Sequence, residues 1–482
     1  MKKNMNYTML CDFYELTMSN GYFQLVWESK ITYFDVFFRR IPDNGGFAIA
    51  AGLEQVIDYI ENLNFDEDDI ALLRKKGIFD EAFLKYLETF KFHGDIYAVP
   101  EGTPVFPNEP ILTVRAPAME AQFIETFILL SLNHQSLIAT KSNRICRAAA
   151  GRPISEFGSR RAQGADAAIL GARAACIGGC AGTACTISDL LFDTPAGGTM
   201  AHSWVQMFDT ELESFQAYCR TYPQKPTLLV DTYNVTKSGV PNAIAAFKEF
   251  GIEDGAIRLD SGDITYLSKK ARKMLDDAGL PNCKIVVSNS LDEFIIRDLL
   301  LQGAQIDAFG VGERLITASS EPVFGCVYKL AAIEDDKGNI IPKIKISENA
   351  EKITTPHFKK VYRIFDNATG NANADLVSIF DEEFDESKPL TIFDSDYPWK
   401  KKVFTDYTMK ELLVPIFKNG EKVYNSPSVA EIKAHSQQQI DKLWDEMKRF
   451  EHPHIYYVDL SEKLWKIKKD LIENNFGKYQ NS

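Results

Sequence analysis

The chain has 482 residues, of which 67 are acidic and 54 are basic, so its formal net charge is -13 at pH 7. Hydrophobic residues make up 45% and charged residues 25%, which is the composition of an ordinary globular protein with a sizeable core. The acidic balance disfavours a nucleic-acid or membrane-surface binder, because both need a basic face, but a small anionic substrate needs only a few local arginines.

Neither the N-terminal residues nor the most apolar stretch of the chain indicates export or insertion into a membrane. No apolar run follows Lys2 and Lys3, so no signal peptide is expected. The most membrane-like stretch, 167–185, is rich in Gly and Ala and is interrupted by Arg173, so we interpret it as buried backbone. The eight cysteines contain no Cys-x-x-Cys pair, which is typical of reduced thiols in a cytoplasmic protein and disfavours a metal site.

The first third of the chain predicts a mixture of helices and strands. Residues 10–22 are expected to form a helix, and 31–40 alternate like a strand that ends at Pro42. Pro and Gly punctuate residues 94–116 like a small all-β segment, and 123–132 is the apolar part of a further helix.

From about residue 150, short apolar runs end in polar or small residues and are followed by helical patterns. They recur every 20–30 residues, about the period of a βα unit, and comprise 227–231, 256–260, 284–288 and 306–310. Such alternation predicts a parallel sheet, with the active groups at the carboxyl ends of its strands. The last third is more charged, and we expect it to be structural. In it, Ser428 and Glu431 resemble a capping box before a helix whose apolar stripe includes Ile432, Leu443, Trp444 and Met447.

Two strand-end motifs contain aromatic, basic and imidazole groups. In 156–161, Phe157 stands beside Arg160 and Arg161, a pattern suited to stacking on a flat anion and gripping its carboxylate or phosphate. Equally, these residues could be a core Phe and two surface arginines. In 197–203, small residues lead to His202, which could be a general base, a phosphate acceptor or a satisfied loop histidine.

Two further motifs suit a phosphorylated sugar. The segment 258–263 ends a strand with Asp260 and Asp263, which could bind a ribose diol or a Mg²⁺-bound pyrophosphate, or could cap a helix. The segments 231–234 and 288–292 end neighbouring strands in the same style. In 309–314, glycines could let backbone N–H groups approach a phosphate, or could serve a tight turn.

In order and type, these motifs resemble nicotinate phosphoribosyltransferase. The resemblance also covers the N-terminal segments 12–18, 37–42 and 46–52. It implies an α/β fold, namely the irregular, TIM-like barrel of type II phosphoribosyltransferases. The barrel would span 136–335, flanked by an α+β domain over 1–135 and by a C-terminal extension over 336–482 that packs on that domain.

The family forms nicotinate mononucleotide and pyrophosphate from nicotinate and phosphoribosyl pyrophosphate, coupled to ATP hydrolysis through a phosphohistidine and with Mg²⁺ as cofactor. The resemblance therefore implies a cytoplasmic homodimer with shared sites, which binds neither nucleic acid nor membranes. It assigns phosphorylation to His202, and ring and carboxylate contacts to Phe157, Arg160, Ser203 and, from a second subunit, Tyr14. It assigns ribose, pyrophosphate and metal contacts to Arg258, Asp260, Ser261, Gly262, Asp263 and Asn289, and the 5′-phosphate to Gly310 and Gly312.

One departure bears on the choice of base. Ala184 and Cys185 follow Gly182-Thr183 where the resemblance leads us to expect Ser and Asn. The related nicotinamide enzyme has an Asp at the position of Ala184, so the absence of a carboxylate here favours the nicotinate anion. The alternatives are the nicotinamide enzyme, a non-catalytic nucleotide sensor and quinolinate phosphoribosyltransferase, whose chains are shorter and lack the His202 motif.

Overall fold

The computed structural model describes residues 6–27 and 29–479, which divide into two units. Within this described part, unit 2 comprises Leu137–Pro322 and Ser428–Ala434, and unit 1 comprises the remaining segments, up to Ser136, Val323–Pro427 and from His435. The division into three domains expected from the sequence stays a prediction.

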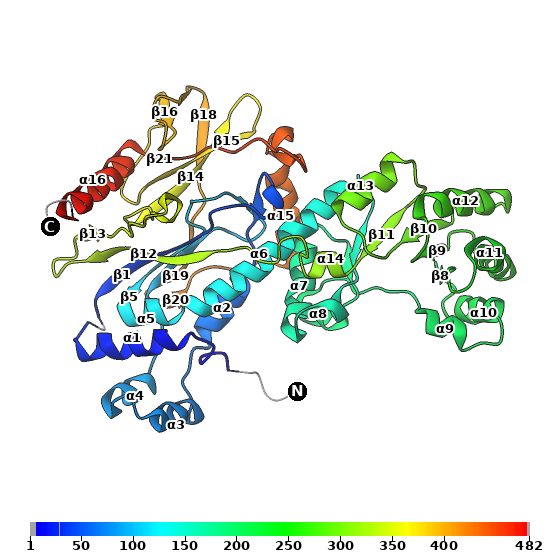
Figure 1. Ribbon diagram of the computed structural model, residues 1–482, viewed down its shortest axis with the longest axis horizontal. Coiled ribbons are helices and arrows are strands. Elements are labelled where there is room, and N and C mark those ends of the chain that lie inside the picture. The colour runs from blue at the N-terminus through cyan, green and yellow to red at the C-terminus, as the bar shows by residue number, and fades with distance from the viewer. Residues whose placement is uncertain (1–5, 28, 480–482) are drawn as a thin grey trace. The chain divides into compact units, whose positions relative to one another are not determined.

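Unit 2 is built on a six-stranded sheet in which every pair of neighbouring strands is parallel (Figure 1). The strand order is β7-β6-β11-β10-β9-β8. The strands are β6 Ile154–Glu156, β7 Gly182–Thr183, β8 Thr227–Leu229, β9 Ala256–Leu259, β10 Lys284–Val287 and β11 Ala308–Val311. Most of their apolar side chains are buried, as expected of strands covered on both faces. The α/β class predicted from the sequence is confirmed.

Helices follow the strands of this sheet, as the 20–30 residue period predicted. Several begin at a side-chain cap: Thr210 and Glu213 form a capping box, and Asp263 and Asp292 accept N–H bonds from the first turns of their helices. The helices are α7 Ala165–Ile177, α8 Thr186–Phe192, α9 His202–Gln206, α10 Glu211–Thr221, α11 Val240–Glu249, α12 Ile264–Asp277, α13 Glu293–Leu301 and α14 Glu313–Ile316.

The Gly- and Ala-rich stretch 167–185 forms part of α7 and the short strand β7. Residues 171–177 of α7 are buried, which agrees with the interpretation as packed backbone. In the described part of the chain, no helix is long and apolar enough to cross a membrane.

Unit 1 contains two larger sheets (Figure 1). The seven-stranded sheet has the order β13-β12-β1-β5-β3-β19-β20, with antiparallel neighbours. Its strands are β1 Ile31–Phe37, β3 Asp95–Ala98, β5 Leu112–Pro117, β12 Val327–Glu334, β13 Ile340–Pro342, β19 Val414–Lys418 and β20 Glu421–Lys422. The four-stranded sheet has the order β18-β14-β15-β21. Its strands are β14 Lys359–Asp366, β15 Ala372–Ile379, β18 Tyr407–Glu411 and β21 Val458–Leu460.

Small strand pairs and helices complete unit 1. The two strand pairs are β2 Ala48–Ile49 with β4 Pro104–Val105, and β16 Leu390–Phe393 with β17 Lys401–Phe404. The helices of the N-terminal part are α1 Phe13–Gln24, α2 Leu53–Glu61, α3 Glu67–Lys76, α4 Glu81–Leu87, α5 Ala118–Phe123 and α6 Glu125–Ala148, which continues into the residues of unit 2.

The C-terminal helical prediction was correct at its start and wrong at its end. Ser428 and Glu431 make the expected capping box before α15 Val429–Asp441, and α16 Glu462–Tyr479 follows later. Leu443, Trp444 and Met447 lie beyond the end of α15, and Met447 belongs to a separate 3₁₀ turn. The predicted apolar stripe is therefore divided among α15, the segment after it and the 3₁₀ turn, although Leu443 and Met447 are buried as expected.

Candidate active site

The order of the strands in unit 2 determines which loops can meet at the carboxyl edge of the sheet. Strand β6 lies between β7 and β11. Strand β9 lies between β8 and β10 (Figure 1), so residues remote in the sequence follow adjacent strands. Carboxyl ends of parallel strands share one edge, and this edge collects most of the residues predicted for the site.

The loop after β6 brings Phe157 against Gly310 in the neighbouring strand β11. Strand β6 pairs with β11 in register from Ile154 to Glu156, and the Phe157 N–H donates to Val311 O at 2.7 Å. A Cβ at Gly310 would lie 2.4 Å from Cδ2 of Phe157, and one at Gly312 would lie 3.1 Å from Phe157 O. The aromatic ring thus occupies the space that a side chain at residue 310 would need.

Glu156, the last residue of β6, is fully buried beneath this loop. Its carboxylate accepts the Gly158 N–H and, at 2.6 Å, the Thr183 hydroxyl from the end of β7. Burial raises the pKa of Glu156, and these two donors oppose that rise. The Ala184 N–H donates to Glu156 O at 2.8 Å, so the loops after β6 and β7 are joined by both backbone and side-chain bonds.

Two arginines, Arg258 and Arg160, bring guanidinium groups to the same edge of the sheet. Arg258 lies on β9 and donates to Thr199 Oγ1 in the Gly-rich segment before His202, whereas its buried Nε has no hydrogen-bond partner. Burial lowers the pKa of Arg258; Asp260 and Asp231 oppose this effect, and the nearby Arg160 adds to it. Arg160 itself is exposed, and its neighbour Arg161 places Nε 3.8 Å from Glu313. Such a pair of cations suits an anionic ligand.

His202 begins α9 and lies among polar groups that follow β8 and β9. Its Nδ1 is 3.1 Å from Thr232 Oγ1, and its Nε2 is 3.9 Å both from Asp231 Oδ1 and from Asp260 Oδ2. The imidazole is 40% exposed, so a substrate can reach it. This environment offers an accessible nucleophile beside two carboxylates.

Two carboxylates form the centre of this cluster. Asp231 is 1% exposed, and its Oδ2 accepts the Asp260 N–H at 3.0 Å and the Ser261 hydroxyl at 2.6 Å, whereas its buried Oδ1 has no hydrogen-bond partner. Asp260 accepts the Ser288 hydroxyl from the end of β10. Three adjacent strand ends are thereby connected through Asp231, Asp260 and Ser288.

The remaining predicted residues of unit 2 are neighbours of these cluster residues along the chain. In the described part of the structure, their side chains make no hydrogen bond to the cluster. Asp263 is exposed and accepts the Tyr266 N–H at 3.0 Å, which makes it the cap of α12. Gly262 has a φ of 83°, a backbone conformation that favours glycine. Asn289 and Ser203 are exposed, and Asn289 Oδ1 accepts the Ser290 hydroxyl at 3.1 Å.

Sequence reasoning missed residues that connect the site. Asp231 and Ser288 were noted in their strand-end motifs but were given no definite role, and Glu156, Thr183, Thr199 and Thr232 were not predicted to hold neighbouring loops. For Asp231 and Ser288 the signal was a polar residue directly after an apolar run, which also fits a helix cap, and the other four residues carried no such signal. Only the strand order shows which of these residues meet.

Tyr14 belongs to unit 1, where it lies on α1 and is 43% exposed. Burial of its hydroxyl and the charge of Glu125 raise the pKa of Tyr14. Its side chain is therefore partly anchored by its own unit, and its ring remains available for a further contact.

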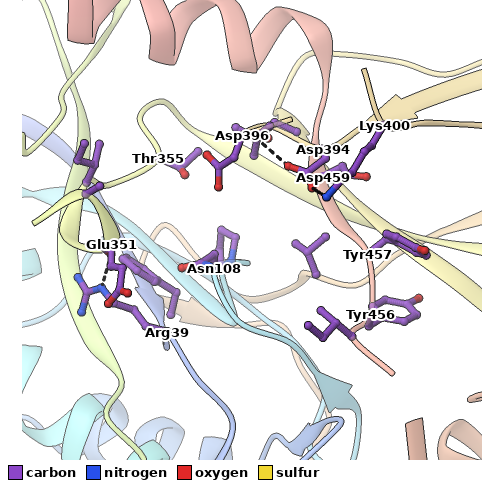
Figure 2. A pocket seen from close by; sticks show the side chains of 18 of the residues that line it. Arg39, Asn108, Glu351, Thr355, Asp394, Asp396, Lys400, Tyr456, Tyr457 and Asp459 are labelled. Atoms are coloured by element: carbon purple, nitrogen blue, oxygen red, sulfur yellow. Dashed lines mark hydrogen bonds and ion pairs between the residues drawn. The ribbon is translucent and has the colours of Figure 1, made fainter. Parts of the chain in front are cut away.

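A separate cavity of about 1190 Å³ lies wholly within unit 1 (Figure 2). Figure 2 shows Arg39 and Glu351 on one side of it and Asp394, Asp459 and Lys400 on another. Asp459 is 7% exposed, and burial together with the charge of Asp394 raises the pKa of Asp459 to about 6. None of the residues predicted for the active site lines this cavity.

Comparison with known proteins gives consistent matches along the chain. The model of the nicotinate phosphoribosyltransferase N-terminal domain matches residues 9–133, and that of the nicotinate phosphoribosyltransferase C-terminal domain matches residues 358–468. The chain is 43% identical over 463 residues to nicotinate phosphoribosyltransferase of Bacillus subtilis (strain 168), which covers 96% of this chain and 94% of the relative. It is 33% identical over 524 residues to the Caenorhabditis elegans protein of the same name, with 95% and 92% coverage.

Solved structures agree with these matches. Human nicotinic acid phosphoribosyltransferase superposes with a TM-score of 0.84 at 26% identity, covering 96% of this chain and 100% of the human chain. Nicotinate-nucleotide pyrophosphorylase from Pyrococcus furiosus superposes with a TM-score of 0.70 at 24% identity, covering 92% and 98%, and this likeness concerns the fold alone.

Proposed function

The chain belongs to the nicotinate phosphoribosyltransferase family, and from this premise we propose how its strand-end site works. Its activity is that of a nicotinate phosphoribosyltransferase in NAD biosynthesis, which joins nicotinate to the ribose of phosphoribosyl pyrophosphate. The further proposal is that ATP hydrolysis is coupled to this reaction through phosphorylation of His202.

Nicotinate binds beside Phe157 in this proposal. The pyridine ring stacks on Phe157, and Arg160 and Ser203 hold its carboxylate. The fixed position of the Phe157 ring against Gly310 supports this assignment, because a stacking platform must be held in place. Ala184 is exposed at the end of β7 and adds no negative charge there, which favours the nicotinate anion.

Phosphoribosyl pyrophosphate binds along the ends of β9, β10 and β11. Arg258 neutralises phosphate charge, Asp260 and the Ser261–Gly262 turn contact the ribose and pyrophosphate, and Asn289, Gly310 and Gly312 complete the site. The pyridine nitrogen attacks the anomeric carbon as the bond to pyrophosphate breaks, so positive charge develops on the ribose. Positioning and the carboxylate field stabilise that charge.

The coupling proposal depends on the surroundings of His202. An accessible imidazole beside Asp231 and Asp260 is the observation that supports it. In this step a ring nitrogen of His202 attacks the γ-phosphorus of ATP, the bond from that phosphorus to the bridging oxygen breaks, and ADP leaves. Phosphorylation adds roughly two negative charges at neutral pH, which changes the field at the pyrophosphate site.

Mg²⁺ fits the oxygen groups of this cluster. Asp231 Oδ1 is buried without a hydrogen-bond partner, and Asp260 Oδ2 lies 3.9 Å from the imidazole Nε2 of His202. Within the described ranges, no group of three or more His, Cys, Asp or Glu residues is arranged to hold a metal. Mg²⁺ would therefore be held by one or two carboxylates together with substrate phosphates, its usual mode, and would neutralise charge on the leaving pyrophosphate. Asp260 is the preferred ligand, because Asp263 already caps α12.

We also propose a homodimer with shared sites, in which Tyr14 of a second copy faces Phe157 across the pyridine ring. The half-exposed ring of Tyr14 on α1 supports this arrangement. Measurement of the mass in solution, together with complementation between Tyr14→Ala and His202→Ala chains, tests it.

The experiment for the coupling step compares wild type with His202→Ala and with His93→Ala, an exposed histidine of unit 1. With ATP labelled at the γ-phosphate, wild type and His93→Ala should carry acid-labile phosphate, and His202→Ala should carry none. His202→Ala should retain weak synthesis that ATP does not stimulate. Equal ATP stimulation in His202→Ala would overturn the coupling proposal.

A further inference from the structure

The loops after β6 and β7 are connected by one buried carboxylate, Glu156. One of its oxygens accepts the Gly158 N–H, and the other accepts the Thr183 hydroxyl at 2.6 Å. Thr183 Oγ1 in turn accepts the Cys185 N–H at 2.9 Å. Glu156 and Thr183 are 0% and 1% exposed, so these bonds are shielded from competing water.

Each end of this Glu156–Thr183 bridge fixes a different wall of the nicotinate site. Gly158 precedes the 3₁₀ turn Ser159–Arg161, so the bond to its N–H sets the start of the turn that carries Arg160. On the β7 side, two backbone bonds fix Ala184. The Ala184 N–H donates to Glu156 O, and the N–H of the following residue, Cys185, donates to Thr183 Oγ1. The bridge therefore joins the carboxylate-binding side to the Ala184 side.

The backbone around the bridge leaves little room for adjustment. A Cβ at Gly158 would lie 2.5 Å from Ile316 Cγ2 and 2.7 Å from Gly312 O. A Cβ at Gly182 would lie 2.5 Å from Pro195 O. Because the loops are confined on their other sides, loss of the bridge should act mainly on the spacing between Arg160 and Ala184.

We propose that the Glu156–Thr183 bridge is a specificity-determining, positioning element, which holds Arg160 and Ala184 at the spacing that recognises a pyridine carboxylate. This inference rests on the proposed function, in which Arg160 binds the nicotinate carboxylate. Neither Glu156 nor Thr183 touches the substrate; both act through the residues that they position. The effect should therefore appear in the recognition of nicotinate rather than of phosphoribosyl pyrophosphate.

The test compares Thr183→Val, which keeps the shape of the side chain but removes its hydroxyl, with Thr183→Ser, which keeps the hydroxyl. Thr183→Val leaves one buried oxygen of Glu156 without a donor, which costs free energy, so we expect a small shift between the side chains of the two loops even though the Ala184 N–H bond to Glu156 O remains. We expect KM for nicotinate to rise about tenfold, equivalent to about 1.4 kcal/mol, while KM for phosphoribosyl pyrophosphate changes less than about twofold. Thr183→Ser should resemble wild type.

Thr113→Val is the matched control for a purely structural effect. Thr113 is a fully buried threonine of unit 1 whose hydroxyl donates to the Asp35 carboxylate at 2.7 Å, so its loss removes the same kind of bond elsewhere. It should lower the melting temperature without a selective rise in KM for nicotinate. If Thr183→Val behaves like Thr113→Val in all these measurements, the positioning role is wrong.

Two more variants separate this inference from the proposed function. Arg160→Ala should raise KM for nicotinate strongly; an unchanged KM would overturn both the Arg160 assignment and the bridge. A raised KM in Arg160→Ala with an unchanged one in Thr183→Val would overturn the bridge alone. If Thr183→Val does not fold, Glu156→Gln replaces it. The amide of Gln keeps one acceptor oxygen, so KM for nicotinate should rise less than in Thr183→Val but in the same direction. An unchanged KM for nicotinate would again overturn the bridge.

Discussion

Replacement of Gly310 by alanine should damage nicotinate binding through the Phe157 ring. The added Cβ would lie 2.4 Å from Cδ2 and 2.5 Å from Cε2 of that ring, whereas ordinary van der Waals contact begins at 3.4 Å. The ring must therefore move by about 1 Å, because Gly310 belongs to the buried strand β11 and its backbone is held by the neighbouring strands.

The size of the effect follows from this displacement. Insertion of one methyl group into a packed site destabilises a protein by about 1 to 3 kcal/mol. A displacement of about 1 Å in a group that positions a substrate can reduce turnover by about a hundredfold. We therefore expect kcat/KM for nicotinate to fall between about tenfold and a hundredfold, which is about 1.4 to 2.7 kcal/mol in transition-state stabilisation.

The assay measures steady-state kinetics with nicotinate varied at saturating phosphoribosyl pyrophosphate, and then the reverse. Gly21→Ala is the control, because Gly21 lies within helix α1 and a Cβ there meets no atom within 4 Å. Circular dichroism verifies that both variants are folded. If folded Gly310→Ala keeps kcat/KM for nicotinate within twofold of wild type, the Phe157 ring does not form the nicotinate platform.

Two further predictions concern carboxylates. Asp263→Ala should lower the stability of the protein by about 1 kcal/mol through loss of the α12 cap, and the Mg²⁺ concentration for half-maximal activity should not change; a raised Mg²⁺ requirement would instead identify Asp263 as a metal ligand. Burial raises the pKa of Asp459 from 3.8 to about 6, so the folded state binds this proton more tightly than the unfolded state does. The contribution of Asp459 to the free energy of unfolding should therefore fall by on the order of 1 to 2 kcal/mol, after a discount for solvent screening, as the pH rises from about 4 to 6. Asp459→Asn should raise the melting temperature at pH 8 more than at pH 5, and an equal change at both pH values would contradict the shifted pKa.

Much of the architecture of unit 2 could be predicted because its signals are local. The apolar runs before Asp231, Asp260, Ser288 and Gly310 became β8, β9, β10 and β11, each followed by a helix or turn. A buried parallel strand needs a short run of apolar residues, and its carboxyl end needs a polar or small residue. Prediction failed at the end of α15, where Leu443, which follows the helix, and Met447, in a separate 3₁₀ turn, are buried by tertiary packing and not by one helical stripe.

The site was predicted as a set of motifs and not as a set of contacts. Phe157, His202 and Asp260 stood out in the sequence because aromatic, imidazole and carboxylate groups followed strand-like runs. The bonds from Asp231 to Asp260 and Ser261 could not be derived from that pattern, because a polar residue after a strand also serves as a helix cap. Asp263 provides such a cap, and its predicted role as a metal ligand stays a prediction.

The sequence by itself determined the strands, the residues at their ends and the family to which these motifs belong, because each depends on neighbouring residues in the chain. The tertiary structure alone decided which strand ends meet. The order β7-β6-β11-β10-β9-β8 places Phe157 on Gly310, Glu156 on Thr183 and Asp260 between Asp231 and Ser288. Strand order depends on how whole βα units pack together, so no local pattern specifies these contacts.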